Sequence, residues 1–480
     1  MSAQLENTSP LGAQRSMTPE QYDLVIIGSG VGSKLAAWTL AGKGQRVAVV
    51  ERRYVGGSCP NIACLPSKNV IHSAKVASLV WGSEAFGVNK TGFNVDMASV
   101  RSRKRNMVTE MVNAHLDLFK RSGAEVIMGS GRFMGPKTIE VTLPDGKTRR
   151  LRGTNVIIGT GTRAALDPIP GLVEAKPLTH VEALELDVVP EQLLVIGAGY
   201  VGLELSQAMM RFGSKVSVIE RGGRLLPRED QDISEALQSM LEKEGLSVVL
   251  NARVKAVSGT SGQIVKVVLE QNGIEKTLIG THLLVATGRI PNTDGLGVEF
   301  AGVELTDRGY VKVNQRLETT ASGVWGVGDV TGGPQFTHIG HDDFRVVSEN
   351  ILGGNRVTTG RQVPFCLFTD PELARVGLNE IEARQQGVAY RLFTLPMAGV
   401  LRTHTLSETQ GFMKALVEKN GDRILGFTTF GVNAGEIMSA VQIAMLAGLP
   451  FTSLRDAVLA HPTLMEGLGS LFASAPSNHD

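Results

Sequence analysis

Two distant segments of this chain repeat one pattern. Residues 24–51 read LVIIGSGVGSKLAAWTLAGKGQRVAVVE and residues 193–220 read LLVIGAGYVGLELSQAMMRFGSKVSVIE, and the two align without a gap. Each segment predicts a short apolar strand, a glycine turn, a helix, and a second apolar strand that ends in glutamate. Such a βαβ unit builds a parallel sheet covered by helices. The repeat therefore predicts an α/β chain with two Rossmann-like dinucleotide-binding domains.

The glycines of both units suit a bound pyrophosphate. Gly28 and Gly197 permit the tight turn after the strand, whereas Gly30 and Gly199 let the backbone approach the ligand. The phosphate charge would then lie at the positive end of the following helix. One glycine turn alone is a weak signal because such turns also serve ordinary α/β packing. Two in register predict two dinucleotide sites.

Two further positions of the motif differ in what they predict. Gly202 completes G-x-G-x-x-G in the second unit, but Ser33 occupies the third position of the first. Close packing of helix on strand is therefore less secure around Ser33. Glu51 and Glu220 each follow the first glycine by 23 positions. This spacing places their carboxylates to accept a hydrogen bond from a ribose 2′-hydroxyl.

Composition narrows the class of protein. A length of 480 residues suggests two to four domains, and a net charge of +1 without a Lys/Arg block argues against nucleic-acid binding. No apolar run is long enough to predict a membrane span. Residues 1–21 lack the features of a signal peptide and are expected to form a flexible arm. Three cysteines do not make a secreted disulfide scaffold, so we expect a reducing, cytoplasmic compartment.

Glycine-rich turns also follow three later strands. NVIIGTGTR at 155–163 and HLLVATGRIP at 282–291 resemble each other and are interpreted as crossings between nucleotide domains. GVWGVGDVTGG at 323–333 is again a strand that runs into glycines, now with Asp329. Beyond residue 350, alternating strands with a turn at Asn420 and Gly421, followed by an apolar helix, predict a third α/β domain.

Five motifs then give the chain a family resemblance. GSGVGS, GGSCPNIACLPSK, GAGYVGLEL, GVGDV and HPTLMEG occur in the order typical of FAD-dependent pyridine nucleotide–disulfide oxidoreductases. That family includes dihydrolipoamide dehydrogenase, glutathione reductase and mercuric reductase. The resemblance extends over nearly the whole chain from Tyr22. It implies an FAD-binding domain at 22–170 and 294–350, an NAD(P)-binding domain at 171–293, and a homodimer interface domain at 351–480.

The resemblance also implies which residues hold the cofactors. For FAD these are Gly28, Gly30, Gly32, Ser33, Glu51, Gly57, Ser58, Thr160, Gly161 and Asp329. For NAD(P) they are Gly197, Gly199, Tyr200, Gly202, Glu220, Arg221 and Gly288. Asp329 would lie at the ribityl chain, and Tyr200 would cover the nicotinamide pocket. Lys68, paired with Glu204, would lie near the reactive flavin nitrogen; a solvated charge on a helix face is the alternative.

Cys59 and Cys64 are five positions apart. A closed zinc site needs about four ligands, and His72 is the one nearby candidate, so no metal site is predicted. In an ideal helix their Cα atoms would be roughly 8.6 Å apart, beyond the reach of about 7 Å for a disulfide. Cys59 should therefore lie at or before a distorted first turn, as Pro60 and Pro66 also indicate. A five-residue loop makes a poor structural staple, whereas a bridge at a helix start is easily reduced, so we interpret the pair as redox-active.

The resemblance assigns the roles in catalysis. Cys64 would contact the flavin, and Cys59 would attack the substrate disulfide. His461, oriented by Glu466, would act as acid and base in the active site of the partner subunit. In the alternative reading, Thr463 and Glu466 form a capping box that opens a helix, and His461 is a simple loop residue.

The electron acceptor is less constrained. The cysteine segment looks closest to mercuric reductase, but that enzyme's C-terminal cysteine pair is missing, and Trp38 stands where glutathione reductases place an arginine. We expect a dihydrolipoamide dehydrogenase-like enzyme acting on a small disulfide or dithiol. Two alternatives to this function are a metal-ion or quinone reductase and the flavoprotein component of a 2-oxoacid dehydrogenase complex. Glu220 favours NADH by repelling a 2′-phosphate, although Arg221 and Arg224 leave NADPH open. Cys366, in the apolar run VPFCLF, is expected in the core.

Overall fold

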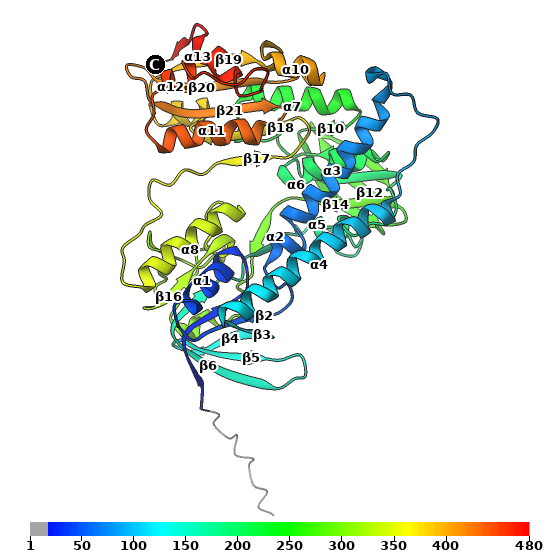
Figure 1. Cartoon of the computed structure of the whole chain (residues 1–480). Coiled ribbons are helices and arrows are strands. Elements are labelled where there is room, and N and C mark those ends of the chain that lie inside the picture. The colour runs from blue at the N-terminus through cyan, green and yellow to red at the C-terminus, as the bar shows by residue number, and fades with distance from the viewer. Residues whose placement is uncertain (1–17, 480) are drawn as a thin grey trace, which may run out of the picture.

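The computed structural model describes residues 18–479 and folds them into three α/β units (Figure 1). The first is a seven-stranded sheet of order β3-β2-β1-β6-β5-β4 with β16 beside β6. Its strands are β1 (Glu20–Ile27), β2 (Val47–Glu51), β3 (Glu125–Met128), β4 (Ser130–Gly135), β5 (Thr138–Thr142), β6 (Thr148–Ile158) and β16 (Val324–Gly326). The pairs of β1 with β2 and β6, and of β16 with β6, are parallel, which confirms the first predicted βαβ unit.

Alternate side chains of the central strands fill the two faces of this sheet. Leu24 and Ile26 lie in one buried cluster, and Val25 and Ile27 in another. Helices α1 (Val31–Ala41), α4 (Met97–Ser122) and α8 (Thr337–Ile351) contribute to the first cluster. A strand buried on both faces needs a continuous apolar run, and each buried Val, Leu or Ile contributes about 1.5–3 kcal/mol.

The arm expected before Tyr22 falls mostly outside the described residues, which begin at 18. Strand β1 already starts at Glu20, which pairs with Leu151 of β6. The Glu20 carboxylate also forms an ion pair of 2.6 Å with Arg149. The first sheet therefore begins slightly earlier than the sequence pattern indicated.

The second unit contains the second predicted βαβ pattern. A parallel four-stranded sheet has the order β10-β9-β8-β14, and an antiparallel sheet of β11, β12 and β13 lies beside it. Its elements are β8 (Gln192–Ile196), α6 (Tyr200–Arg211), β9 (Lys215–Ile219), α7 (Gln231–Glu244), β10 (Ser247–Val249), β11 (Ala252–Gly259), β12 (Val265–Gln271), β13 (Ile274–Gly280) and β14 (His282–Val285). The expected crossings are confirmed, because β7 (Thr162–Ala164) and β15 (Arg289–Pro291) pair antiparallel between the two units.

The third unit is a six-stranded sheet of order β17-β18-β21-β20-β19-β22. Its strands are β17 (Phe365–Leu367), β18 (Glu372–Gly377), β19 (Tyr390–Pro396), β20 (Phe412–Glu418), β21 (Ile424–Gly431) and β22 (Ser477–His479). Helices in and around it are α9 (Glu380–Gln385), α10 (Leu401–Leu406), α11 (Ala434–Leu446), α12 (Phe451–Arg455) and α13 (Gly467–Ala473). The predicted turn at Asn420 and Gly421 joins β20 to β21, and the apolar helix that follows is α11.

The remaining elements are short, apart from the helix that carries Cys64. They are α2 (Ser58–Asn61), α3 (Cys64–Trp81) and α5 (His180–Ala183), with the 3-10 turns η1 (Ser83–Phe86), η2 (Val298–Ala301), η3 (Gly328–Thr331) and η4 (Met397–Gly399). Figure 1 shows the first sheet at one end of the molecule and the third unit at the other. No helix in residues 18–479 is both long and apolar enough to cross a membrane.

A buried lysine ties the third unit to the second. The Lys414 ammonium lies 3.0 Å from Asp230, 2.8 Å from Asp232 and 2.6 Å from Glu380. Burial lowers the pKa of Lys414, but its hydrogen bonds to Asp232 and Glu380 outweigh this, so the pKa lies above its usual value. The three carboxylates therefore hold this cation, and losing it would leave them close together, with Arg384 still paired to Glu380 at 2.7 Å.

Candidate active site

Two cavities meet at the carboxyl ends of the parallel strands of the first sheet. One, of about 600 Å³, is lined by Cys59, Cys64 and Lys68, and the other, of about 690 Å³, by Glu51 and Thr160. The residues that line both are Gly30, Ser58, Gly159, Gly161, His180 and Arg289. The two cavities thus form one long cleft, in the place where open α/β sheets bind dinucleotides.

The glycine turn at this cleft has no room for side chains. Gly28 has φ +91°, and a Cβ there would lie 2.4 Å from the carbonyl oxygen of Gly159. A Cβ on Gly57 would lie 2.5 Å from the Cα of Gly30, and one on Gly32 would lie 2.9 Å from a carbonyl oxygen of α8. The backbone at the start of α1 is therefore exposed to the cleft at close range, which fits the pyrophosphate of FAD.

Glu51 is held rigidly at the end of β2. Its Oε2 accepts hydrogen bonds from the backbone N–H (2.9 Å) and hydroxyl (2.7 Å) of Ser29. Its Oε1 accepts from the backbone N–H of Arg53 (2.8 Å) and of Tyr54 (3.0 Å). The carboxylate lines the cleft with its orientation already set, a position that fits the predicted contact with a ribose hydroxyl.

Helix α1 packs closely on strand β6 even though Ser33 replaces the third glycine of the motif. Its side chain is fully buried, and a Cβ on Gly159 would lie 1.9 Å from its hydroxyl oxygen. Gly159, directly after β6, therefore provides the space that a glycine at position 33 would otherwise provide. Sequence reasoning missed this because the two residues are distant in the chain.

We expect Gly159→Ala to weaken FAD binding by at least about tenfold, since the new methyl group would push α1 away from β6. The double variant Ser33→Gly with Gly159→Ala should restore most of the affinity. FAD dissociation from purified protein, followed by flavin fluorescence, measures the effect. Equal FAD affinity of Gly159→Ala and the wild type would contradict this packing account.

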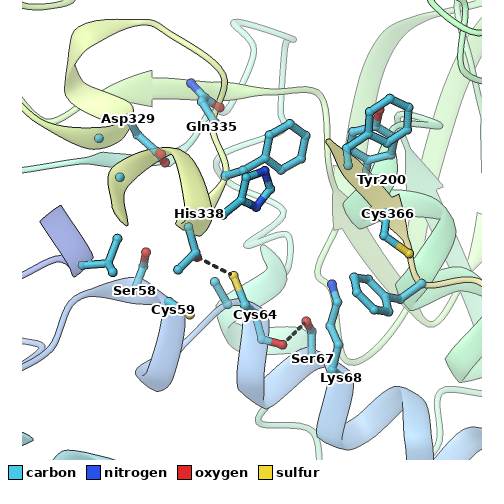
Figure 2. Close-up of a pocket in the computed structure, with 18 of the residues that line it drawn as sticks. Ser58, Cys59, Cys64, Ser67, Lys68, Tyr200, Asp329, Gln335, His338 and Cys366 are labelled. Atoms are coloured by element: carbon cyan, nitrogen blue, oxygen red, sulfur yellow. Dashed lines mark hydrogen bonds between the residues drawn. The ribbon is translucent and has the colours of Figure 1, made fainter. Parts of the chain in front are cut away.

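The two cysteines lie on either side of a break between the short helix α2 and the long helix α3. Cys59 is in α2 and Cys64 is the first residue of α3, and Ala63 between them has φ −131° and ψ −102°. This confirms the predicted distorted turn. Both cysteines are free thiols in this structure, and the Sγ of Cys64 lies 3.2 Å from the hydroxyl of Thr337 (Figure 2).

The surroundings of the pair shift the pKa values of the two thiols in opposite directions. A hydrogen bond from the Cys59 thiol and another from Thr337 lower the pKa of Cys64 to about 6 against the opposing effect of burial, and the charge of Lys68 adds to this. The pKa of Cys59 is raised, because its thiol donates to Cys64 and is buried. Near neutral pH the reduced pair therefore holds one proton on Cys59 and a thiolate on Cys64.

The predicted partnership of Lys68 and Glu204 is confirmed. Lys68 Nζ lies 2.7 Å from Oε2 of Glu204, while Oε1 of Glu204 accepts the backbone N–H of Phe368 at 2.9 Å. The ammonium also lies 4.7 Å from the centre of the Phe368 ring. Figure 2 shows Lys68 one turn beyond Cys64 on α3. The pair is therefore fixed at the cleft and is not a solvated charge on a helix face.

Asp329 lines the cavity that holds the cysteines, and its neighbours include residues that sequence reasoning did not identify. Its Oδ2 accepts a hydrogen bond from the Thr162 hydroxyl at 2.9 Å, and Arg289 Nε donates to the same hydroxyl at 2.7 Å. His180 is 8% exposed, and its Nε2 has no partner among the described residues. Burial and the charge of Arg289 lower its pKa to about 4, so its imidazole is neutral. Only the fold brings these groups together.

The second glycine turn has the geometry of a nucleotide site as well. A Cβ on Gly197 would lie 2.6 Å from a backbone oxygen of Ala286, and one on Gly202 would lie 2.1 Å from the carbonyl oxygen of Gly197. No described atom lies within 4 Å of a Cβ built on Gly199, so the backbone there faces open space. The oxygens of Glu220 accept the backbone N–H groups of Ala198 (3.0 Å) and Gly222 (2.8 Å).

The other residues predicted for this site are spread around it. Tyr200 begins α6 and lies with its ring centre 5.6 Å from that of Phe365. Gly288 has φ +145°, a conformation that favours glycine, and Arg221 is exposed next to Glu220. Their predicted contacts with NAD(P)H fit these positions.

His461 and Glu466 form a pair, but not at the cysteines of their own chain. His461 Nδ1 lies 3.0 Å from the Glu466 carboxylate, its side chain is 65% exposed, and neither residue lines the cleft. The alternative capping box is not formed, because the Thr463 hydroxyl donates to the carbonyl of Ala460 and α13 begins only at Gly467. The imidazole is therefore exposed to solvent and held by Glu466.

Cys366 lies in strand β17 and packs against the hydrophobic core of the third unit, as expected, but it also borders the cleft. The residue is half-buried and lines the same cavity as Cys64, because this strand passes the mouth of the cleft. Burial raises the pKa of Cys366. Its thiol is therefore protonated and unreactive near neutral pH.

Comparison with known protein families agrees with this geometry. The pyridine nucleotide-disulphide oxidoreductase model matches residues 22–343, and the dimerisation domain of that family matches residues 363–471. The probable pyridine nucleotide-disulfide oxidoreductase RclA of Escherichia coli (strain K12) is 35% identical over 459 residues, which are 94% of this chain and 99% of that protein.

Other relatives have different acceptors in their names. A mercuric reductase of Bacillus cereus is 35% identical and covers 93% of this chain and 70% of its own length. A dihydrolipoyl dehydrogenase of Thermus scotoductus is 36% identical, over 93% of this chain and 96% of its own. The solved Cu(II) complex of the HOCl-induced flavoprotein disulfide reductase RclA from Escherichia coli has a TM-score of 0.86 at 34% identity, over 95% of this chain and 99% of its own. The chain therefore belongs to the pyridine nucleotide–disulfide oxidoreductases, homodimeric FAD-dependent enzymes that use NAD(P)H and act on sulfur groups.

Proposed function

We propose that this enzyme uses NADH to reduce a small disulfide through Cys59 and Cys64. The observation that supports it is the thiol pair at the dinucleotide cleft, in which the pKa of Cys64 is lowered to about 6 while the pKa of Cys59 is raised. Gly28, Gly30 and Glu51 would hold FAD in the cleft, where the cofactor would supply the two-electron chemistry between NADH and the Cys59–Cys64 pair. A reducing, cytoplasmic compartment suits such thiols.

The chain's own residues carry out the exchange with substrate. In the dithiol form, Cys59 attacks one sulfur of the substrate disulfide, a mixed disulfide forms, and the first product thiol leaves. The Cys64 thiolate then attacks Cys59, releases the second product thiol, and restores the Cys59–Cys64 disulfide. Lys68 lowers the cost of the negative charge on Cys64 throughout, and Glu204 orients Lys68.

We further propose that each active site is built from two subunits. His461 is exposed, paired with Glu466, and absent from the cleft of its own chain. In the homodimer, His461 of the partner subunit would take the proton of Cys59 as it attacks, and return it to the leaving thiolate. Glu466 would hold the imidazole in position for both transfers.

NADH is the proposed donor because of Glu220. The carboxylate stands at the end of β9 and is fixed by two backbone N–H groups, so it cannot easily turn away from a bound ribose. A 2′-phosphate at that place would meet a negative charge at close range. Arg221 is exposed, and Arg224 is turned to the carbonyl oxygen of Pro227 at 2.8 Å.

A metal ion is the second candidate acceptor. The similar RclA has been solved as a Cu(II) complex, and another relative is named mercuric reductase. Two adjacent thiols, one of them ionised near neutral pH, are soft ligands for such ions. The C-terminal segment of this chain, LFASAPSNHD, contains no cysteine that could deliver the ion.

The test is steady-state turnover of the flavoprotein with NADH or NADPH against lipoamide, glutathione disulfide and Cu(II). We expect a kcat/KM for lipoamide at least about tenfold above that for glutathione disulfide, and a similar preference for NADH over NADPH. Turnover of Cu(II) but of no disulfide would favour the metal-ion acceptor. A strong preference for NADPH would contradict the reading of Glu220.

A further inference from the structure

A second cation lies against the loop that leads into the cysteine turn. Lys34 of α1 is only 8% exposed. Its Nζ donates a hydrogen bond to the carbonyl of Gly56 at 3.3 Å and lies 2.9 Å from Nε2 of His115, on α4. It also lies 5.8 Å from the centre of the Trp38 ring. Helices α1 and α4 thus place this ammonium against the loop that leads into Cys59.

This cation has no permanent counter-ion. No carboxylate of the described residues lies within ion-pair distance of Lys34, and burial lowers its pKa to about 8. Burial and the nearby Lys34 charge also lower the pKa of His115 to about 4, so its imidazole is neutral. Its Nε2 therefore accepts a hydrogen bond from the Lys34 ammonium. A buried ammonium with only neutral partners is costly, and nothing in the exchange described above uses it.

The titratable group whose charge is coupled to Lys34 is the thiol of Cys59. Electrostatic interaction between the two raises the pKa of Lys34 and lowers that of Cys59. Other charged or titratable groups near the turn come from α3, α4, α6 and α8: Cys64, Lys68, His115, Glu204 and His338. Lys68 and Glu204 act on Cys64, which leaves Lys34 as the cation for Cys59.

We propose that Lys34, anchored by His115, is a positioning residue that stabilises the thiolate of Cys59 while it attacks the substrate disulfide. This rests on the proposed disulfide exchange. The negative charge on Cys59 exists only between loss of its proton to His461 of the partner subunit and formation of the mixed disulfide. In the second step Cys64 attacks the Cys59 sulfur, and the negative charge leaves on the product thiolate. Lys34 therefore stabilises the Cys59 thiolate relative to the resting disulfide. A fixed positive charge accelerates the attack in this way, because it favours the charged species that forms only during that step.

The test measures Cys59 directly, in a Cys64→Ser background that removes the second thiol. The rate of alkylation by iodoacetamide is followed against pH, with mass spectrometry of the peptide that holds Cys59. Adding Lys34→Met should raise the apparent pKa of Cys59 by about one unit and slow alkylation at pH 7 about tenfold. Lys34→Arg should retain the profile of the Cys64→Ser parent below about pH 8. The effect of Lys34→Met should fade above that pH, where Lys34 itself loses its proton.

A control variant and a second test variant show whether the effect is specific to the buried Lys34 charge. Lys43→Met changes an exposed lysine just beyond α1 and should leave the alkylation profile unchanged. His115→Asn, which retains the cation but loosens it, should give a smaller shift and serves if Lys34→Met does not fold. Identical profiles for Lys34→Met and its parent would overturn the proposal. Failure of the disulfide-reductase function would instead appear as no disulfide turnover in the wild type, whatever the alkylation rates.

Discussion

Replacing Cys59 by serine should lower NADH-driven disulfide reduction by about a thousandfold or more, because an alcohol near neutral pH is a far weaker nucleophile than a thiolate. Reduction of the bound flavin by NADH should remain, since Cys59 lies on the substrate side of the pair. Stopped-flow absorbance follows the flavin, and a coupled thiol assay follows the product.

The matched control is Cys366→Ser. That thiol lines the same cavity, but burial raises its pKa and keeps it protonated, so its loss should change turnover less than about twofold. Undiminished disulfide turnover in Cys59→Ser would sink the exchange scheme. A large loss in Cys366→Ser would mean that the wrong thiol has been assigned.

The second large effect is expected at His461. His461→Gln removes the acid–base group and should lower kcat for disulfide reduction by about a hundredfold to ten-thousandfold, with loss of one limb of the pH–rate profile. Flavin reduction by NADH should not change, because His461 is assigned only to the proton of Cys59 in the exchange with the disulfide substrate.

Mixed dimers test whether the site is shared. The Cys59→Ser and His461→Gln homodimers should each be nearly inactive, but a mixed dimer contains one site with both native residues. Random reassociation of equal amounts should therefore recover about a quarter of the wild-type activity. No recovery, with mixed dimers shown to form by mass spectrometry, would contradict an active site completed by the partner subunit.

Local pattern was enough to predict much of this fold and part of the site. The strands around Gly28 and Gly197 show their apolar runs and turns within one short segment, so the two βαβ units could be read directly. The distorted turn at Cys59 followed from helix geometry alone. The pairing of Lys68 with Glu204 was predicted only through the family resemblance, because the two residues lie on different helices.

The contacts that pattern could not predict are those between distant segments. Nothing near Ser33 in the chain shows that Gly159 gives it room. Lys34 and His115 each look like an ordinary helix residue until α1 and α4 are packed. His180 and Arg289 become neighbours only where the two crossings meet. That Cys366 also lines the cavity could not be predicted, because an apolar strand can pack against a core and border a cavity at the same time.

One measurement tests the central claim most directly: the visible spectrum of the flavoprotein during anaerobic titration with NADH. We predict a long-wavelength charge-transfer band after two electrons, from the Cys64 thiolate beside the flavin. The band should be strong at pH 7.5, fade as the pH falls through about 6, where Cys64 takes up a proton, and be missing in Cys64→Ser. Direct bleaching of the flavin without this band would show that the cysteines do not communicate with it, and would contradict the account.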